Sequence, residues 1–251
     1  MSVFPREFHS MLSPKGRRFF NAARRDKAPR RERFRIFYEL LDAKLCADCV
    51  AALDRHMLPY VHTVSSPIPP ESITKMKENY GELLPKSMRI RTHELNSKRS
   101  AGYEAARRLG LLDMLNSESL REFAQLTSGL PLENDVGRQV IAYRAGDYSG
   151  PHNDHHPEND DADIGYVDLH IMLGMPGVKN QYLVYETNGH FSNIVDVASE
   201  PAIAVYHLPF WHYTTPLVVD PKRPSARRWL ILGTFGINRS ELRRIQRARK
   251  R

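Results

Sequence analysis

The feature that most constrains the fold is a change in the character of the chain at residue 137. Beyond it the segments are short, rich in Val, Ile, Tyr and Thr, and separated by clusters of Gly, Asn, Asp and Pro. Such segments are typical of β-strands joined by turns. About eight strands are expected, one near residue 150 and the others at 137–146, 166–174, 180–187, 191–197, 201–209, 212–219 and 227–236. Eight short antiparallel strands favour a double-stranded β-helix, or jelly roll.

Helices are expected ahead of these strands. Apolar residues recur at intervals of three and four, which predicts helices over 36–57, 95–116 and 119–127. Helices followed by strands indicate an α+β fold, and we expect the N-terminal helices to pack on one sheet. The absence of an internal repeat or a long linker predicts one unit over 37–236, with a helical part at 37–130 and a jelly-roll core at 137–236.

Charge divides the chain in a second way. The net charge is +8, yet residues 1–36 hold eleven Lys and Arg against three acidic residues, and 237–251 hold seven against one. Between them, 37–236 carry nineteen basic and twenty-five acidic residues, so the central part is acidic. We therefore define 1–36 as a basic N-terminal segment and 237–251 as a basic C-terminal tail. Such ends attract polyanions such as nucleic acid or anionic lipid, and a merely solvated surface is the equal alternative.

The two cysteines, Cys46 and Cys49, lie within an apolar helical pattern and lack a second CxxC pair. This setting favours small core residues over a redox or zinc pair. No apolar run reaches the roughly 18 residues that a membrane helix needs, and the N-terminus lacks the apolar core of a secretory signal. A cytoplasmic location is therefore expected.

Candidate metal ligands lie in the stretch QVIAYRAGDYSGPHND, which ends with His152 and Asp154. In an extended strand, residues two apart point to the same face, so the two side chains can share a metal ion. His212, in PFWHYTTP, is the candidate third ligand. Two histidines and one carboxylate that leave coordination positions open are typical of non-haem Fe(II) oxygenases. The acidic loop at 155–165 is expected to form a lid or substrate rim.

These motifs carry a family resemblance. The segment YRAGDYSGPHND resembles the HxD strand of the prolyl 4-hydroxylase-like branch of the Fe(II)/2-oxoglutarate-dependent oxygenases. PAIAVYHLPFWHYTTPLVV and the following RRWLILGTF resemble the distal-histidine strand and the 2-oxoglutarate-binding strand of that superfamily. The resemblance covers 137–236, with three motifs in the required order. One departure is PGVKNQYLVYE, where relatives often have a Gly-Gly turn.

The resemblance implies that His152, Asp154 and His212 ligate Fe(II), with 2-oxoglutarate and O2 as co-substrates. Halogenating relatives lack the carboxylate that Asp154 supplies, so oxygenation is favoured. The implied activity is hydroxylation of a substrate C–H bond, with release of succinate and CO2. The branch suggests a peptidyl or amino-acid side chain as substrate.

The resemblance also implies an arginine that binds the far carboxylate of 2-oxoglutarate. Arg228 is preferred because its planar guanidinium can form two parallel hydrogen bonds to a carboxylate. Arg227 is the rival, and neighbouring residues on a strand face opposite sides. Tyr143 matches a tyrosine that can bind the same carboxylate, or else is a half-buried structural residue. Tyr148 is placed at the substrate mouth.

Four other histidines are weighed against these ligands. His207 precedes His212, but only His212 begins the HxxTP pattern of the family. His155 and His156 are expected to be exposed loop residues. His170, in an apolar strand, is expected to be a hydrogen-bonded core or pocket histidine.

Other functions remain open from the sequence. The nearest enzymatic alternative is a demethylase of alkylated nucleic acid, which the basic ends would suit. The others are a non-catalytic jelly-roll binding protein and a cupin-type enzyme that uses only the metal.

Overall fold

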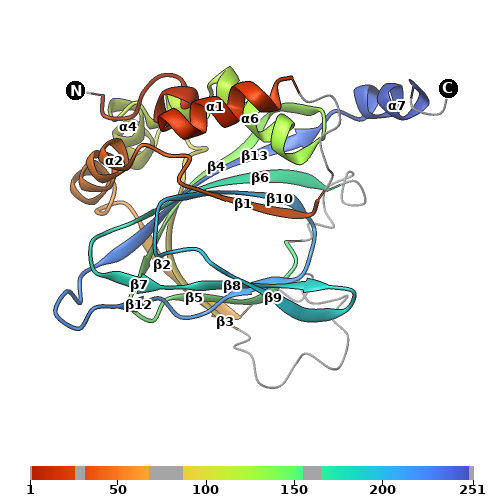
Figure 1. Ribbon diagram of the computed structural model, residues 1–251. Coiled ribbons are helices and arrows are strands. Elements are labelled where there is room, and N and C mark those ends of the chain that lie inside the picture. The colour runs from red at the N-terminus through yellow and green to blue at the C-terminus, as the bar shows by residue number, and fades with distance from the viewer. Residues whose placement is uncertain (1, 26–31, 68–86, 155–164, 249–251) are drawn as a thin grey trace.

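A curled antiparallel sheet forms two facing layers in the computed structural model, with helices on the outer face of one layer (Figure 1). The structure describes residues 2–25, 32–67, 87–154 and 165–248. The helix-covered layer holds β1, β10, β6, β13 and β4, and the facing layer holds β5, β11, β8 and β9. The α+β arrangement with N-terminal helices on one sheet is therefore confirmed.

The main sheet has 11 strands rather than about eight. Ten follow the order β1-β10-β6-β13-β4-β3-β5-β11-β8-β9, β2 pairs with β3, and β7 and β12 form a separate pair. The expected count is wrong because the N-terminal half contributes three strands to the sheet. The bounds are β1 Phe34–Tyr38, β2 His62–Pro67, β3 Ser87–Glu94, β4 Leu132–Arg144, β5 Tyr148–His152, β6 Tyr166–Gly174, β7 Val178–Asn180, β8 Tyr182–Thr187, β9 His190–Asp196, β10 Ala202–Leu208, β11 His212–Thr214, β12 Val218–Val219 and β13 Arg227–Ile237.

Most of the helices begin at side chains that satisfy free backbone N–H groups. Ser13, Asp42, Ser100 and Ser117 each accept a hydrogen bond from the backbone N–H three residues further on. The helical elements are η1 Phe8–Met11, α1 Pro14–Ala23, α2 Ala43–His56, α4 Ala101–Arg108, α5 Leu111–Leu115, α6 Glu118–Ser128 and α7 Arg239–Ala248. Within the described residues, no helix is both long enough and apolar enough to span a membrane.

One of the three predicted helices is confirmed, and two need correction. Helix α6 matches the prediction at 119–127. The prediction at 36–57 is wrong at its start, because Phe34–Tyr38 forms strand β1 on the edge of β10 and the helix begins at Ala43. The prediction at 95–116 merges α4 and α5, which are separated at Gly110, where the backbone has a φ of 78°. A left-handed residue of this kind interrupts a helix.

Strand β13 separates two apolar cores, because alternate residues point to opposite faces. Trp229 and Ile231 are fully buried in the core beneath the helices. Leu230 belongs to the core between the two layers, and Arg228 lines the cavity there. One strand therefore supports the helical layer and the interior of the jelly roll together.

The helical layer includes part of the basic N-terminal segment. Phe8 and Phe20 are buried in its core, and Phe8 packs edge-on against Phe123 of α6. Cys46 and Cys49 of α2 are also buried there, and burial raises the pKa of each thiol to about 12. Both thiols stay protonated at neutral pH, as expected of core residues.

Candidate metal centre

Strand pairing brings together the two predicted histidine ligands, which are 60 positions apart in the sequence. His152, the last residue of β5, lies directly opposite His212, the first residue of β11. Their ring centroids are 4.3 Å apart, and both residues are buried. The two imidazoles therefore lie at the same edge of the jelly roll.

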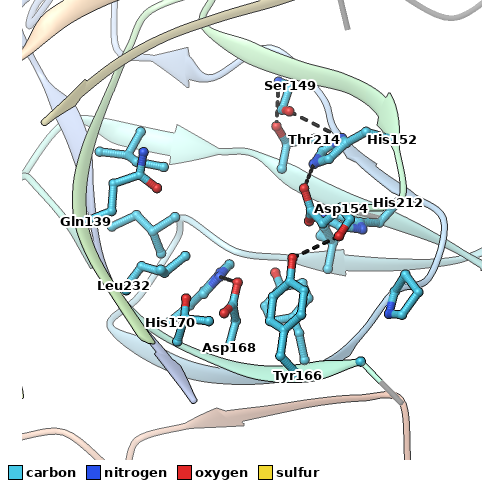
Figure 2. Close-up of a pocket in the computed structure, with 18 of the residues that line it drawn as sticks. Gln139, Ser149, His152, Asp154, Tyr166, Asp168, His170, His212, Thr214 and Leu232 are labelled. Atoms are coloured by element: carbon cyan, nitrogen blue, oxygen red, sulfur yellow. Dashed lines mark hydrogen bonds and ion pairs between the residues drawn. The ribbon is translucent and has the colours of Figure 1, made fainter. Parts of the chain in front are cut away.

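Asp154 completes this group, although not from a strand as expected. Strand β5 ends at His152, and the backbone of Asp154 is left-handed, with a φ of 53°. Its carboxylate nevertheless lies between the histidines (Figure 2). Oδ1 is 3.4 Å from Nε2 of His152, and Oδ2 is 3.4 Å from Nε2 of His212. The ligand atoms of the three residues all lie within 4.8 Å of one another. The turn after the strand thus brings the carboxylate to the histidines.

Backbone carbonyls fix which nitrogen of each histidine faces the group. Nδ1 of His152 donates to the carbonyl of Gly150 at 2.6 Å, and Nδ1 of His212 donates to that of Phe210 at 2.9 Å. Since a carbonyl oxygen only accepts, each Nδ1 carries the proton and each Nε2 has a free lone pair. Such contacts orient histidine ligands in metal sites.

Electrostatics favours the neutral form of the His212 imidazole. Burial, followed by the neighbouring imidazole of His152, lowers the pKa of His212 to about 4. A neutral imidazole is the form that binds a metal. The donor set of two neutral nitrogens and one carboxylate is suited to a divalent ion of intermediate hardness such as Fe(II).

A cavity of about 990 Å³ opens beside this group, between the two layers of the sheet. His152, Asp154 and His212 line one part of it, and Arg228 and Tyr143 another. A volume of this order accommodates a co-substrate together with part of a second molecule.

Arg228 enters the cavity, and Arg227 does not. The Arg228 side chain is 2% exposed, donates from Nε to Oε1 of Gln181 at 2.9 Å, and packs 4.4 Å from the ring centre of Tyr143. Burial lowers its pKa from the ordinary value, and it forms no ion pair with any carboxylate of the described residues. Arg227 instead faces the helices, with Nε 3.6 Å from Oδ1 of Asp54 in α2. Arg228 is therefore a buried cation in the cavity wall, and Arg227 is not.

The two tyrosines occupy different surroundings. Tyr143 is buried opposite Arg228 on β4, and burial raises the pKa of its phenol. Tyr148 is half-buried at the start of β5 and is not among the described residues that line the cavity. Tyr143 thus lies beside Arg228 in the cavity wall, and Tyr148 does not.

The other histidines take separate positions. His207 of β10 does not belong to the candidate metal group. His155, His156 and the predicted lid up to residue 164 lie outside the described residues. His170 of β6 faces the cavity, with its ring centre 4.2 Å from that of Tyr206.

Two residues of the site were missed from the sequence. Gln181 is fully buried and accepts a hydrogen bond from Arg228, yet it is a single residue between β7 and β8 and gives no pattern of its own. Asp168 is 7% exposed and lines the cavity. A signal existed for Asp168, because a charged residue inside the apolar stretch YVDLHIMLG is unusual and shares a strand face with His170.

The chain is similar in fold to solved structures of oxygenases. An oxidoreductase of the 2OG-Fe(II) oxygenase family from Burkholderia pseudomallei is 13% identical, with a TM-score of 0.50 over 91% of this chain and 94% of that chain. The non-heme alpha ketoglutarate dependent carbocyclase SnoK from nogalamycin biosynthesis is 10% identical, with a TM-score of 0.50 over 91% and 85%. A prolyl-4-hydroxylase from Pseudomonas putida is 15% identical, with a TM-score of 0.46 over 81% and 92%.

No family model and no curated protein matches the sequence. The two structures with a TM-score of 0.50 show that the chain has the fold of 2-oxoglutarate-dependent Fe(II) oxygenases. The fold that the three sequence motifs imply is therefore confirmed.

Proposed function

We propose that this protein is an Fe(II)- and 2-oxoglutarate-dependent oxygenase that hydroxylates a C–H bond of its substrate, with release of succinate and CO2. One observation carries the proposal: a His-Asp-His group and a buried arginine without a carboxylate partner line the same cavity. A metal-binding group alone is common to many enzymes. The added buried cation calls for a ligand that also carries an anionic end, as 2-oxoglutarate does.

The residues of the chain fit both groups. His152 and His212 would bind Fe(II) through Nε2 and Asp154 through its carboxylate, which leaves coordination positions open. Arg228 would bind the far carboxylate of 2-oxoglutarate, with Gln181 orienting the guanidinium. When bound, the iron and 2-oxoglutarate supply the oxidising chemistry with O2, and the protein contributes orientation and a dry site.

The resemblance to the prolyl hydroxylase branch supports a peptidyl or amino-acid side chain as substrate. Demethylation of alkylated nucleic acid would use the same metal group and is the alternative. The basic ends also belong to the proposal, as surfaces that contact a polyanion.

Calorimetry of the full chain with Fe(II) under anaerobic conditions tests the proposal. We expect 2-oxoglutarate to bind the wild type, and His152→Ala to lose metal binding. We expect Arg228→Ala to keep the metal and bind 2-oxoglutarate at least about tenfold more weakly, because a charge-assisted contact is lost. Arg227→Ala is the matched control and should bind 2-oxoglutarate like the wild type.

Three results would contradict the proposal. A metal-loaded wild type that neither binds 2-oxoglutarate nor forms succinate from it would exclude the function. Unchanged 2-oxoglutarate affinity in Arg228→Ala would remove the proposed anchor. A larger loss in Arg227→Ala than in Arg228→Ala would transfer the role to Arg227.

A further inference from the structure

A second polar pair lies across the cavity from the metal group. Asp168 and His170 are two residues apart on β6, so both side chains point inward from the same face of the strand. Figure 2 shows them together beside Tyr166, facing the side of the cavity that holds Asp154 and His212. The proposed binding of iron and 2-oxoglutarate assigns no task to this pair.

The carboxylate of Asp168 forms no hydrogen bond through Oδ1, and its one ion-pair contact among the described residues is a long one to His170. Its Oδ1 is inaccessible to water and forms no hydrogen bond within the described part of the chain. Its Oδ2 lies 3.8 Å from Nε2 of His170, beyond hydrogen-bond distance, and that Nε2 also forms no hydrogen bond there. Buried polar groups in proteins nearly always have partners, so an unpaired one in a cavity wall marks a place for a ligand.

The neighbouring side chains do not supply the missing donor. Thr234 of β13 and Tyr206 of β10 are the cross-strand neighbours of Asp168, and neither is a cation. The amide of Gln139, which also lines the cavity, donates to Thr92 at 2.6 Å. Among the described residues, His170 is the one basic side chain within 4 Å of Asp168. Asp168 is therefore a desolvated acceptor with no lysine or arginine of the described residues within 4 Å.

Aromatic rings connect this place to the metal group. The ring of Tyr206 lies 4.2 Å from that of His170 and 5.6 Å from that of the proposed ligand His212. One aromatic ring thus separates the pair from the metal group, and the face of a neutral tyrosine favours a nearby cation. A short side chain bound at Asp168 would lie next to the metal.

We propose that Asp168, flanked by His170 and Tyr206, binds a primary amine or guanidinium group of the substrate. This inference rests on the proposed function, because the bound cation would hold a neighbouring C–H bond toward the iron. The substrate class is thereby narrowed to molecules or side chains that carry a positive charge a few bonds from the oxidised carbon.

Binding of small probes by the full chain tests the inference directly. The probes are N-acetyl-lysine amide and N-acetyl-arginine amide, with N-acetyl-norleucine amide as a neutral control of similar length. Affinities are measured by NMR titration without metal, and again with Fe(II) and 2-oxoglutarate in the absence of O2. We expect at least one cationic probe to bind about tenfold tighter than the neutral one, as a charge-assisted hydrogen bond provides.

Variants assign that preference to a residue. Asp168→Asn keeps the size of the side chain and should remove the preference for the cation. The same change in the exposed Asp113 of α5 is the matched control and should preserve it. Equal binding of cationic and neutral probes to the wild type would overturn the inference even if Asp168→Asn failed to fold. So would a preference that persists in a folded Asp168→Asn variant.

The two proposals fail in distinguishable ways. If 2-oxoglutarate does not bind but the Asp168-dependent preference appears without metal, the cation site stands and the oxygenase function falls. If 2-oxoglutarate binds and no probe shows the preference, the function stands and the cation site falls.

Discussion

At the scale of single residues, Gln181 is one of two acceptors that hold Arg228, the other being the carbonyl of Val197. Oε1 of Gln181 accepts from Nε of Arg228, and its Nε2 donates to the carbonyls of Thr215 at 2.9 Å and Asp147 at 3.2 Å. The amide thus joins the buried guanidinium to the residue after the strand of His212 and to the residue before the strand of His152. A fully buried group with both ends engaged orients its partner rigidly.

We expect Gln181→Met to weaken 2-oxoglutarate binding about tenfold, because Arg228 loses one of its fixed acceptors and becomes less well oriented. Titration calorimetry of the Fe(II)-loaded protein measures this change. Metal affinity should stay close to that of the wild type, since Gln181 contacts no proposed ligand of the metal. Unaltered 2-oxoglutarate affinity in a folded variant would show that Gln181 does not position Arg228.

The residue scale also shows what the sequence could and could not resolve. Alternation along a strand establishes that Arg227 and Arg228 face opposite sides, but not which side is the cavity. That choice depends on the position of α2, whose Asp54 takes Arg227. The prediction that the side chains of His152 and Asp154 lie close together is confirmed. Its reason was partly wrong, because the left-handed backbone of Asp154, and not a shared strand face, brings the carboxylate to the histidine.

At the scale of elements, β13 explains why the helical layer and the cavity depend on each other. Its register with β4 and β6 places Arg228 beside Tyr143 and Gly174, and Ile231 beside Val140 and Ile171. A shift of β13 that changes the packing beneath the helices would also displace its side chains in the core between the two layers. The helices therefore help to position the arginine without contacting it.

We expect Ile231→Ala to lower the free energy of unfolding by about 2–5 kcal/mol, because it leaves a cavity in a packed core. Ile194→Ala is the matched control on β9, where the side chain is 66% exposed, and should change stability by less than about 0.5 kcal/mol. Urea unfolding followed by circular dichroism gives both values. Equal costs in the two variants would contradict the assignment of β13 to the core.

Elements were predictable where local pattern and tertiary structure agree. Helix α6 has a serine cap and a consistent apolar spacing, and its bounds were close. Strand β1 was missed because Phe37 and Leu40 fit a helical spacing, while pairing with β10, far away in the sequence, determines the outcome. Long-range pairing of this kind overrides local propensity and leaves little trace in the sequence.

At the scale of the whole molecule, basic and acidic residues are segregated along the chain. Part of the basic N-terminal segment packs on the sheet as α1, and Figure 1 shows α7 extending from the body at the C-terminal end. Some of these charges are already paired, as Arg24 is with Glu122 and Arg244 with Glu241. Most of the basic residues of the tail have no acidic neighbour in the sequence.

We expect the full chain to bind a fluorescent single-stranded oligonucleotide with an affinity that falls as salt is raised, because bound cations are released from the polyanion. Deleting 238–251, which leaves β13 complete at Ile237, should weaken binding and reduce the salt dependence. Fluorescence anisotropy at several salt concentrations measures both effects. Binding that is absent at low salt, or unaffected by the deletion, would contradict a role for the tail.

The order of helices and strands was enough to predict the α+β jelly roll, because each half of the chain has its own hydrophobic period. The closure of the sheet was not predictable in detail. Strands β2 and β3 lie between two of the predicted helices. Only the pairing of β3 with β4 and β5, and of β2 with β3, identifies them as part of the sheet.

The position of Trp229 on β13 has a practical consequence. The chain contains two tryptophans, and each directly adjoins a proposed binding residue, Trp229 next to Arg228 and Trp211 next to His212. Both indoles are buried, so bulk solvent contributes little to their emission. We therefore expect intrinsic fluorescence to change when the metal and co-substrate bind, which can be measured without any label.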